Sequence, residues 1–177
     1  QTGQDYRHYI ENTIFGLPFF KVNEHFLNGT ARLELPFGVS EGEQVDQAAN
    51  LALWAEAIWM PSVWVTDPRV RWEPADESSA ILVVPFNEEE ERFTVTFDSD
   101  SGLLLSMESM RYKAADSPNK TLWVNEVAEW SKLGQFLQPI RANVTWMDEG
   151  TPWARFQTLE VVYNTDVSST IQNSGLE

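Results

Sequence analysis

The sequence contains no cysteine among its 177 residues, which excludes disulfides, thiolate catalysis and Cys-ligated zinc. Basic residues are few, because 12 Lys and Arg face 27 Asp and Glu and leave a net charge of -15. Binding to nucleic acid requires neutralised phosphates, so this charge predicts no nucleic-acid partner. Long hydrophobic runs are also missing, and no stretch approaches the ~18 apolar residues of a membrane-spanning helix.

Groups that carry catalysis are scarce as well. The two histidines, His8 and His25, stand near no Ser-containing nucleophile elbow, and the glycine motifs of phosphate and dinucleotide sites are missing. The acidic cluster 98–100 and the Glu run 88–91 offer oxygens for calcium, but Asp, Ser and Gly are also the ordinary residues of turns. Asp148 and Glu149 are adjacent acids beside a glycine, which favours a solvated turn over a glycosidase pair. The sequence therefore predicts a protein that is not an enzyme and has no metal and no cofactor.

Alternation of apolar and polar residues predicts a chain made mostly of β-strands. The segment 17–27 alternates in this way, and Asn28-Gly29, a pair that tolerates positive φ, predicts a hairpin into the next strand. Further strands are expected over 70–73, 80–86, 93–97, 103–113, 122–129, 140–147 and 153–163. Their spacing and the short polar turns between them predict an antiparallel meander rather than parallel βαβ units.

One amphipathic helix is expected over 46–60, with Asp46 as its N-cap and Pro61 as its end. A shorter amphipathic stretch over 6–15 predicts a second helix. The fold class is thus α+β and mostly β: one large curved antiparallel sheet of about eight strands, with the main helix packed on its concave face. We expect a single domain over residues 1–165 and a flexible C-terminal tail over 166–177, whose last residues are candidates for a vector remnant.

Aromatic residues are abundant, with eight Trp and ten Phe. Core and strand-edge packing is the simpler interpretation, and the alternative is that several rings line a cavity between helix and sheet. In the strand over 103–113, either face brings a charge inward, Arg111 on one and Glu108 on the other. We prefer Arg111 at the mouth of the cavity, with Glu56 or Glu126 as its partner, although a strand end that projects into solvent explains the pattern equally well. The predicted ligand-binding residues are Trp54, Glu56, Trp59, Trp72, Arg111 and Trp146.

The order of several short motifs resembles an uncharacterised bacterial and archaeal family, a domain of unknown function, over residues 15–165. The motifs are Gly16-Leu17-Pro18-Phe19-Phe20, Asn28-Gly29, the helix segment 53–62, Arg71-Trp72-Glu73, 93–98, Met110-Arg111-Tyr112, Pro139-Ile140-Arg141 and Thr151-Pro152-Trp153. The resemblance implies a half-barrel similar to that of the LolA-like lipoprotein carriers, a curved sheet closed over an apolar cavity, although this chain has one clear helix where the carriers have several. It also implies an extracytoplasmic location, with tethering to a membrane through an N-terminal segment that precedes Gln1.

These features predict a non-enzymatic extracytoplasmic domain that binds an apolar or lipid-like ligand, with Arg111 near a polar headgroup. The first alternative is a structural or protein-interaction module that takes no small molecule and whose partner protein is unknown. A more distant alternative is a carbohydrate-active protein, because tryptophan surfaces also stack on sugars.

Overall fold

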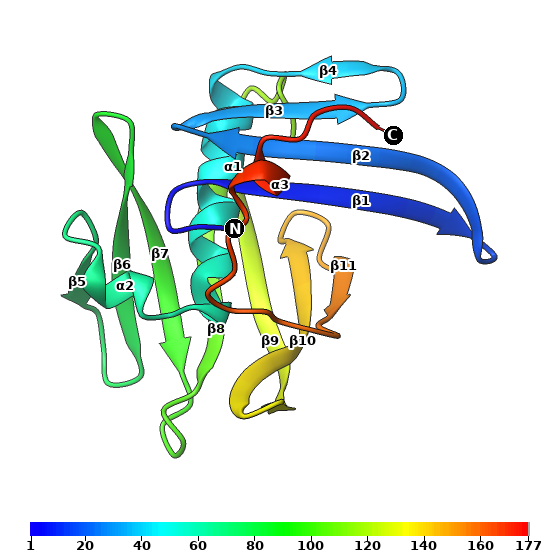
Figure 1. The fold of residues 1–177 in the computed structure, drawn as a ribbon. Helices are drawn as coiled ribbons and strands as arrows, with labels where there is room; N and C mark the ends of the chain where they lie inside the picture. The colour runs from blue at the N-terminus through cyan, green and yellow to red at the C-terminus, as the bar shows by residue number, and fades with distance from the viewer. Residues whose placement is uncertain (177) are drawn as a thin grey trace. The chain divides into compact units, whose positions relative to one another are not determined.

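The computed structural model describes residues 1–176, and the chain in it is mostly β (Figure 1). Its strands form two antiparallel sheets, one of four strands and one of seven. The expected mostly-β, antiparallel class is confirmed, but the expectation of one large sheet of about eight strands is wrong. The chain breaks its pairing after β4, where the helix α1 separates the two meanders.

The first sheet has the strand order β1-β2-β3-β4. Its strands are β1 (Tyr6–Ile14), β2 (Leu17–Leu27), β3 (Thr30–Leu35) and β4 (Gly38–Ser40). β2 begins and ends where the sequence predicts, and Asn28 and Gly29 take φ of 52° and 82° in the turn to β3, as this hairpin requires.

The predicted helix over 6–15 is wrong, since this segment is strand β1. Each of its residues from Tyr6 to Ile14 pairs with β2. Tyr6, Tyr9 and Ile10 have the i, i+3, i+4 spacing of one face of a helix, which is why the sequence favours that structure. Pairing with the adjacent strand overrode this local pattern.

The main helix, α1 (Glu43–Glu56), begins three residues before the predicted cap and continues into the single 3-10 turn η1 (Ala57–Trp59). Asp46 therefore lies inside the helix and is not its N-cap. Its carboxylate instead accepts a hydrogen bond from the Ala31 backbone N–H of β3 at 2.6 Å, so that it ties the helix to the four-stranded sheet. The Gly42 carbonyl accepts the first helical bonds, from Val45 and Asp46.

The second sheet has the order β11-β10-β9-β8-β7-β6-β5, a meander whose strands each pair with the next along the chain. Its strands are β5 (Arg71–Pro74), β6 (Ser79–Phe86), β7 (Glu89–Phe97), β8 (Leu104–Arg111), β9 (Thr121–Leu133), β10 (Phe136–Trp146) and β11 (Pro152–Gln157), and the short helix α2 (Val63–Thr66) precedes β5. β6 is buried on both faces, with Leu82 and Val83 fully buried, as its continuous apolar run predicts.

Contacts between residues divide the described chain into two compact units. Unit 1 contains residues 1–53, 112–118 and 164 onward, and therefore the four-stranded sheet, while unit 2 contains residues 54–111 and 119–163 and the seven-stranded sheet. The predicted single domain with a boundary at 165 stays a prediction. The tail residues 166–176 belong to unit 1, where the helix α3 (Ser168–Ile171) contacts β1 and Ile171 is buried, and Glu177 lies outside the described residues.

The central packing of unit 2 gives a test of the sheet assignment. Leu82→Ala deletes a fully buried side chain of β6 and is expected to lower the free energy of unfolding by about 2–5 kcal/mol. Leu105→Ala, on β8 of the same sheet but 42% exposed, is the matched control and is expected to cost much less. Urea denaturation at neutral pH measures both, and equal losses would contradict the packing described.

Candidate functional site

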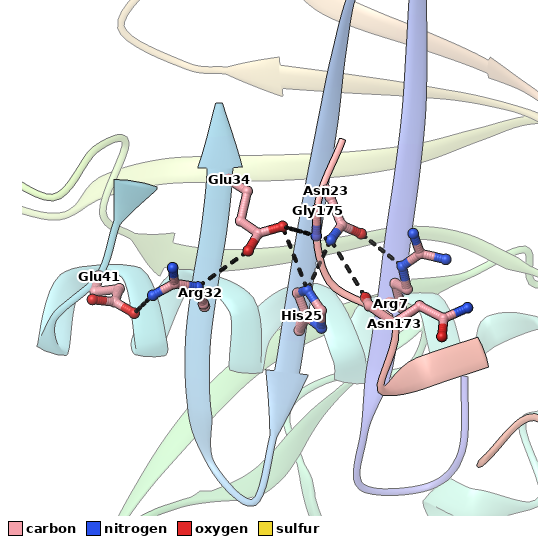
Figure 2. Close-up of polar contacts among 8 residues, drawn as sticks. All are labelled: Arg7, Asn23, His25, Arg32, Glu34, Glu41, Asn173 and Gly175. Atoms are coloured by element: carbon pink, nitrogen blue, oxygen red, sulfur yellow. Dashed lines mark hydrogen bonds and ion pairs between the residues drawn. The ribbon is translucent and has the colours of Figure 1, made fainter. Parts of the chain in front are cut away.

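Each unit holds a grouping of polar or charged side chains with low exposure that is a candidate site. The first lies on the four-stranded sheet of unit 1 and is shown in Figure 2. Asn23 is fully buried at its centre, and its side chain lies between Arg7 of β1 and Glu34 of β3. We call this grouping, with His25 and the C-terminal residues that join it, the Asn23 cluster.

The hydrogen bonds of the Asn23 cluster fix the orientation of the buried amide. Arg7 Nε donates to Asn23 Oδ1 at 2.6 Å, and because a guanidinium only donates, the atom that faces it is the amide oxygen. The amide nitrogen of Asn23 then faces His25 Nε2 and Glu34 Oε2, each at 2.8 Å. His25 Nε2 therefore accepts a hydrogen bond, which assigns the proton of a neutral ring to Nδ1.

Glu34 also holds the end of the chain. Its Oε2 accepts the backbone N–H of Gly175 at 2.7 Å, and its Oε1 accepts Arg32 Nε at 3.2 Å (Figure 2). The hydrogen bond from Asn23, with those from Gly175 and Arg32, lowers the pKa of the Glu34 carboxyl below its ordinary value, against the opposing effect of burial. The Asn23 cluster thus clamps residues 173–175 to the sheet, and we assign it a structural role.

This clamp predicts an acid-sensitive contribution to stability. Because the Glu34 pKa is lower in the folded protein, its stabilisation is complete above the ordinary value of 4.5 and is lost as the pH falls through the lower folded value. Glu34→Gln is expected to lower the free energy of unfolding by about 1–3 kcal/mol at pH 7, and the difference from wild type is expected to shrink at acid pH.

Urea denaturation over a pH series measures this effect. Glu41→Gln is the control, because Glu41 also pairs with Arg32 but its side chain is 55% exposed, and we expect a change within about 0.5 kcal/mol. A Glu34→Gln deficit that is independent of pH would show that the carboxylate charge is not what holds the clamp.

The second grouping lies on the seven-stranded sheet of unit 2, where Arg111 stacks on two indole rings. Its guanidinium carbon is 4.5 Å from the ring centroid of Trp123 and 5.5 Å from that of Trp146. The two rings are 6.4 Å apart, and both tryptophans are buried. Such stacking of a cation on desolvated aromatic rings is worth about 2 kcal/mol. We call these three residues the Arg111 cluster.

Strand register places the Arg111 cluster on one face of the sheet. Trp123 of β9 pairs with Ser109 of β8 on one side and with Trp146 of β10 on the other, and Arg111 follows Ser109 by two residues. The prediction that Arg111 rather than Glu108 belongs with the aromatic set is consistent with this placement. The predicted partner Glu126 is wrong, however, because it pairs with Ser106 and lies on the opposite face.

Two hydrogen-bond donors on the same face of the sheet as Arg111 have no acceptor among the described residues. They are the indole Nε1 of Trp123 and the amide Nδ2 of Asn125, two residues further along the same face of β9. Leaving a buried donor unsatisfied costs about 1–3 kcal/mol, so each orphaned donor requires an explanation. Nearby, Lys120 Nζ and Glu91 Oε1 form an ion pair at 2.6 Å.

The other predicted ligand-binding residues lie elsewhere in unit 2. Trp54 and Trp72 are linked through Trp64. The indole Nε1 of Trp64 donates to the backbone carbonyl of Trp54 at 3.0 Å, and the indole Nε1 of Trp72 donates to the backbone carbonyl of Trp64 at 3.1 Å. This relay fixes the segment 54–66 to β5. The indole Nε1 of Trp54 itself is buried without an acceptor among residues 1–176.

Trp59 forms a third group, because its Nε1 donates to the Pro139 carbonyl of β10 at 3.3 Å. The Tyr163 hydroxyl donates to the Trp59 carbonyl at 2.7 Å, and burial raises the pKa of that tyrosine. Glu56 is the last residue of α1. Among the six predicted residues, the structure therefore brings Arg111 and Trp146 into direct contact and holds Trp54, Trp59 and Trp72 by backbone bonds.

Sequence reasoning missed Trp123, Asn125 and Trp64. The alternation of β9 places Trp123 and Asn125 on one face, but only the pairing with β8 shows that Arg111 shares it.

The acidic turn at 98–102 agrees with the turn interpretation, since Asp98 accepts hydrogen bonds from the backbone and hydroxyl of Ser101. Within residues 1–176, no group of three or more His, Asp and Glu side chains is arranged to hold a metal ion, and no helix is long and apolar enough to cross a membrane.

Residues 2–157 match a family described as a family of unknown function, DUF6544. The chain belongs to this family. The match covers both sheets and the Arg111 cluster, and confirms the resemblance to an uncharacterised family. Comparison with curated proteins gave no match, and neither did comparison with solved structures, so the LolA-like likeness has no support from a structural neighbour.

Proposed function

We propose that this DUF6544 chain is a non-enzymatic binding domain for an apolar, lipid-like molecule with an acidic headgroup, held at the Arg111 cluster. The observation that carries the proposal is the group of donors on one face of the seven-stranded sheet: the Arg111 guanidinium over the Trp123 ring, the orphaned N–H of that ring, and the orphaned amide of Asn125 further along the same face. A carboxylate has only acceptors and complements a set of donors.

The chemistry of stacking supports this assignment. A guanidinium that lies over an indole makes this contact through its flat face, whereas its N–H donors lie in the guanidinium plane, the plane in which carboxylates bind a guanidinium. Trp123 and Trp146 also supply a large apolar surface beside the charge, which an acyl chain would contact. A polar group with an apolar tail is therefore the kind of molecule that fits both parts of the cluster.

The remaining parts of the proposal rest on the sequence. The non-enzymatic role follows from the scarcity of nucleophile and base pairs, and an extracytoplasmic location with a carrier-like half-barrel follows from the family resemblance. The roles of Trp54, Glu56, Trp59 and Trp72 as ligand contacts stay predictions. Their carbonyl bonds favour the view that Trp59 and Trp72 shape the unit rather than touch the ligand.

Binding of a fluorescent sixteen-carbon fatty acid to detergent-free protein tests the proposal. We expect saturable binding, competition by palmitic acid, and at least tenfold weaker competition by the neutral alcohol of equal length, because the alcohol lacks the charge that Arg111 binds. Native mass spectrometry of the same preparation reads out the stoichiometry. A protein that binds neither compound overturns the proposal.

Variants assign the binding to the cluster. Arg111→Met keeps most of the side-chain volume and is expected to weaken fatty-acid binding about tenfold, which corresponds to about 1.4 kcal/mol. Arg141→Met, on β10 of the same sheet with a side chain that is 61% exposed, is the matched control and is expected to bind as wild type does. Trp123→Phe, which keeps a ring but removes the N–H, is expected to weaken binding by a smaller factor. Equal affinities of the Arg111 and Arg141 variants would remove the cluster from the proposal.

A further inference from the structure

The outer half of the β1–β2 hairpin in unit 1 has no neighbouring strand. β3 pairs with β2 only from Asn23 to Leu27, so the pairs from Ile10 and Val22 outward form a two-stranded ribbon, as Figure 1 shows for the part of the hairpin beyond β3. A two-stranded hairpin is only marginally stable in water by itself. The apolar side chains of this ribbon are therefore not explained by packing in the core of a sheet.

The end of the ribbon is strongly apolar and open to solvent. Residues 12–20, Asn-Thr-Ile-Phe-Gly-Leu-Pro-Phe-Phe, contain no charge, and we call them the apolar tip. Phe15 is fully exposed, and Leu17 and Phe19 are 70% and 65% exposed. Phe15 also occupies the first turn position with φ of 51°, a conformation that is costly for a bulky residue and places its ring at the extreme end of the hairpin.

A different set of side chains lies next to the apolar tip, where the ribbon joins the sheet. The Lys21 ammonium is 5.6 Å from the Tyr9 ring and pairs with Glu11 at 3.6 Å, and Glu11 and Lys21 form the strand pair that precedes the apolar tip. We call Tyr9 and Lys21 the collar. Tyrosine and long basic side chains are the residues that mark the boundary between headgroups and water, because they have an apolar body and a polar end.

The dimensions agree with shallow insertion into a bilayer. Three residue pairs, Asn12 with Phe20, Thr13 with Pro18 and Ile14 with Leu17, separate Lys21 of the collar and its partner Glu11 from the turn. At about 3.4 Å per residue they span about 10 Å, the depth of interfacial elements that stop at the boundary of headgroups and acyl chains. Insertion to this depth keeps the unpaired strand edges near headgroups and water, where their N–H and C=O groups remain solvated.

We propose that the β1–β2 hairpin docks the protein on a lipid bilayer, with the apolar tip inserted into the interface and the collar at the headgroups. The electrostatics favour neutral, zwitterionic lipid: the apolar tip has no charge, Glu11 offsets Lys21, and the whole chain carries a net charge of -15. The protein surface thus offers no general attraction to anionic lipid. This inference is independent of the ligand proposed for the Arg111 cluster.

Flotation of the whole chain with phosphatidylcholine vesicles tests the docking. We expect wild-type protein to float with the vesicles and the double variant Phe15→Ser/Phe19→Ser to partition at least tenfold less. The matched control is Val65→Ser/Leu159→Ser, which removes two exposed apolar side chains of unit 2 and is expected to float as wild type does. Circular dichroism shows whether each variant is folded, and Arg111→Met, which alters only the ligand cluster, is expected to float normally.

The absence of cysteine allows a second, direct measurement. Phe15→Cys and Val65→Cys each provide a single site for an environment-sensitive fluorophore. On addition of phosphatidylcholine vesicles, the label at position 15 is expected to shift to shorter wavelength and gain intensity, whereas the label at position 65 is expected to stay unchanged.

Three results would overturn the docking proposal. The first is wild-type protein that remains in the aqueous fraction, and the second is a Phe15/Phe19 variant that floats as well as wild type. The third is self-association, measured by analytical ultracentrifugation, that the Phe15/Phe19 substitutions abolish while vesicle binding is absent. That last result would assign the apolar tip to a second copy of the chain.

Discussion

The pairing register of β8, β9 and β10 is the constraint on which the candidate site depends. Trp123 meets Ser109 on one side and Trp146 on the other, and this alignment brings the Arg111 guanidinium over both rings. Side chains alternate strictly between faces, so a slip of one residue in β9 would move Trp123 and Asn125 to the opposite face. The many fully buried residues of the sheet make such a slip costly, and they therefore hold the cluster in place.

The two polar groupings differ in how completely their donors are satisfied. In the Asn23 cluster, the buried amide, the imidazole and the Glu34 carboxylate bind one another and the C-terminal residues, which is the pattern of a structural clamp. On the seven-stranded sheet, the N–H groups of Trp123 and Asn125 lack acceptors in the described chain. Buried donors cost free energy when they are left open, and for this reason the second grouping, rather than the first, is the candidate for a ligand.

Sequence periodicity was reliable where local chemistry and tertiary contacts agree. Asn28-Gly29 forms the expected turn because both residues accept positive φ, and the apolar run of β6 is buried on both faces. It failed where tertiary contacts overrode the local pattern. Tyr6, Tyr9 and Ile10 have helical spacing but lie in a strand that pairs with β2, and Asp46 has the chemistry of a cap but contacts Ala31 of β3 from within the helix. A hydrogen bond to a distant strand has no signature in the local sequence.

By itself, the sequence determined the antiparallel β class, most strand positions and the one main helix, because these follow from alternation, turn chemistry and composition. The tertiary structure decided that the strands form two sheets, that Trp123 rather than Glu126 meets Arg111, and that residues 173–175 join the Asn23 cluster. These outcomes depend on which strands pair and in which register. Register is set by packing between segments far apart in the chain, and no local pattern specifies it.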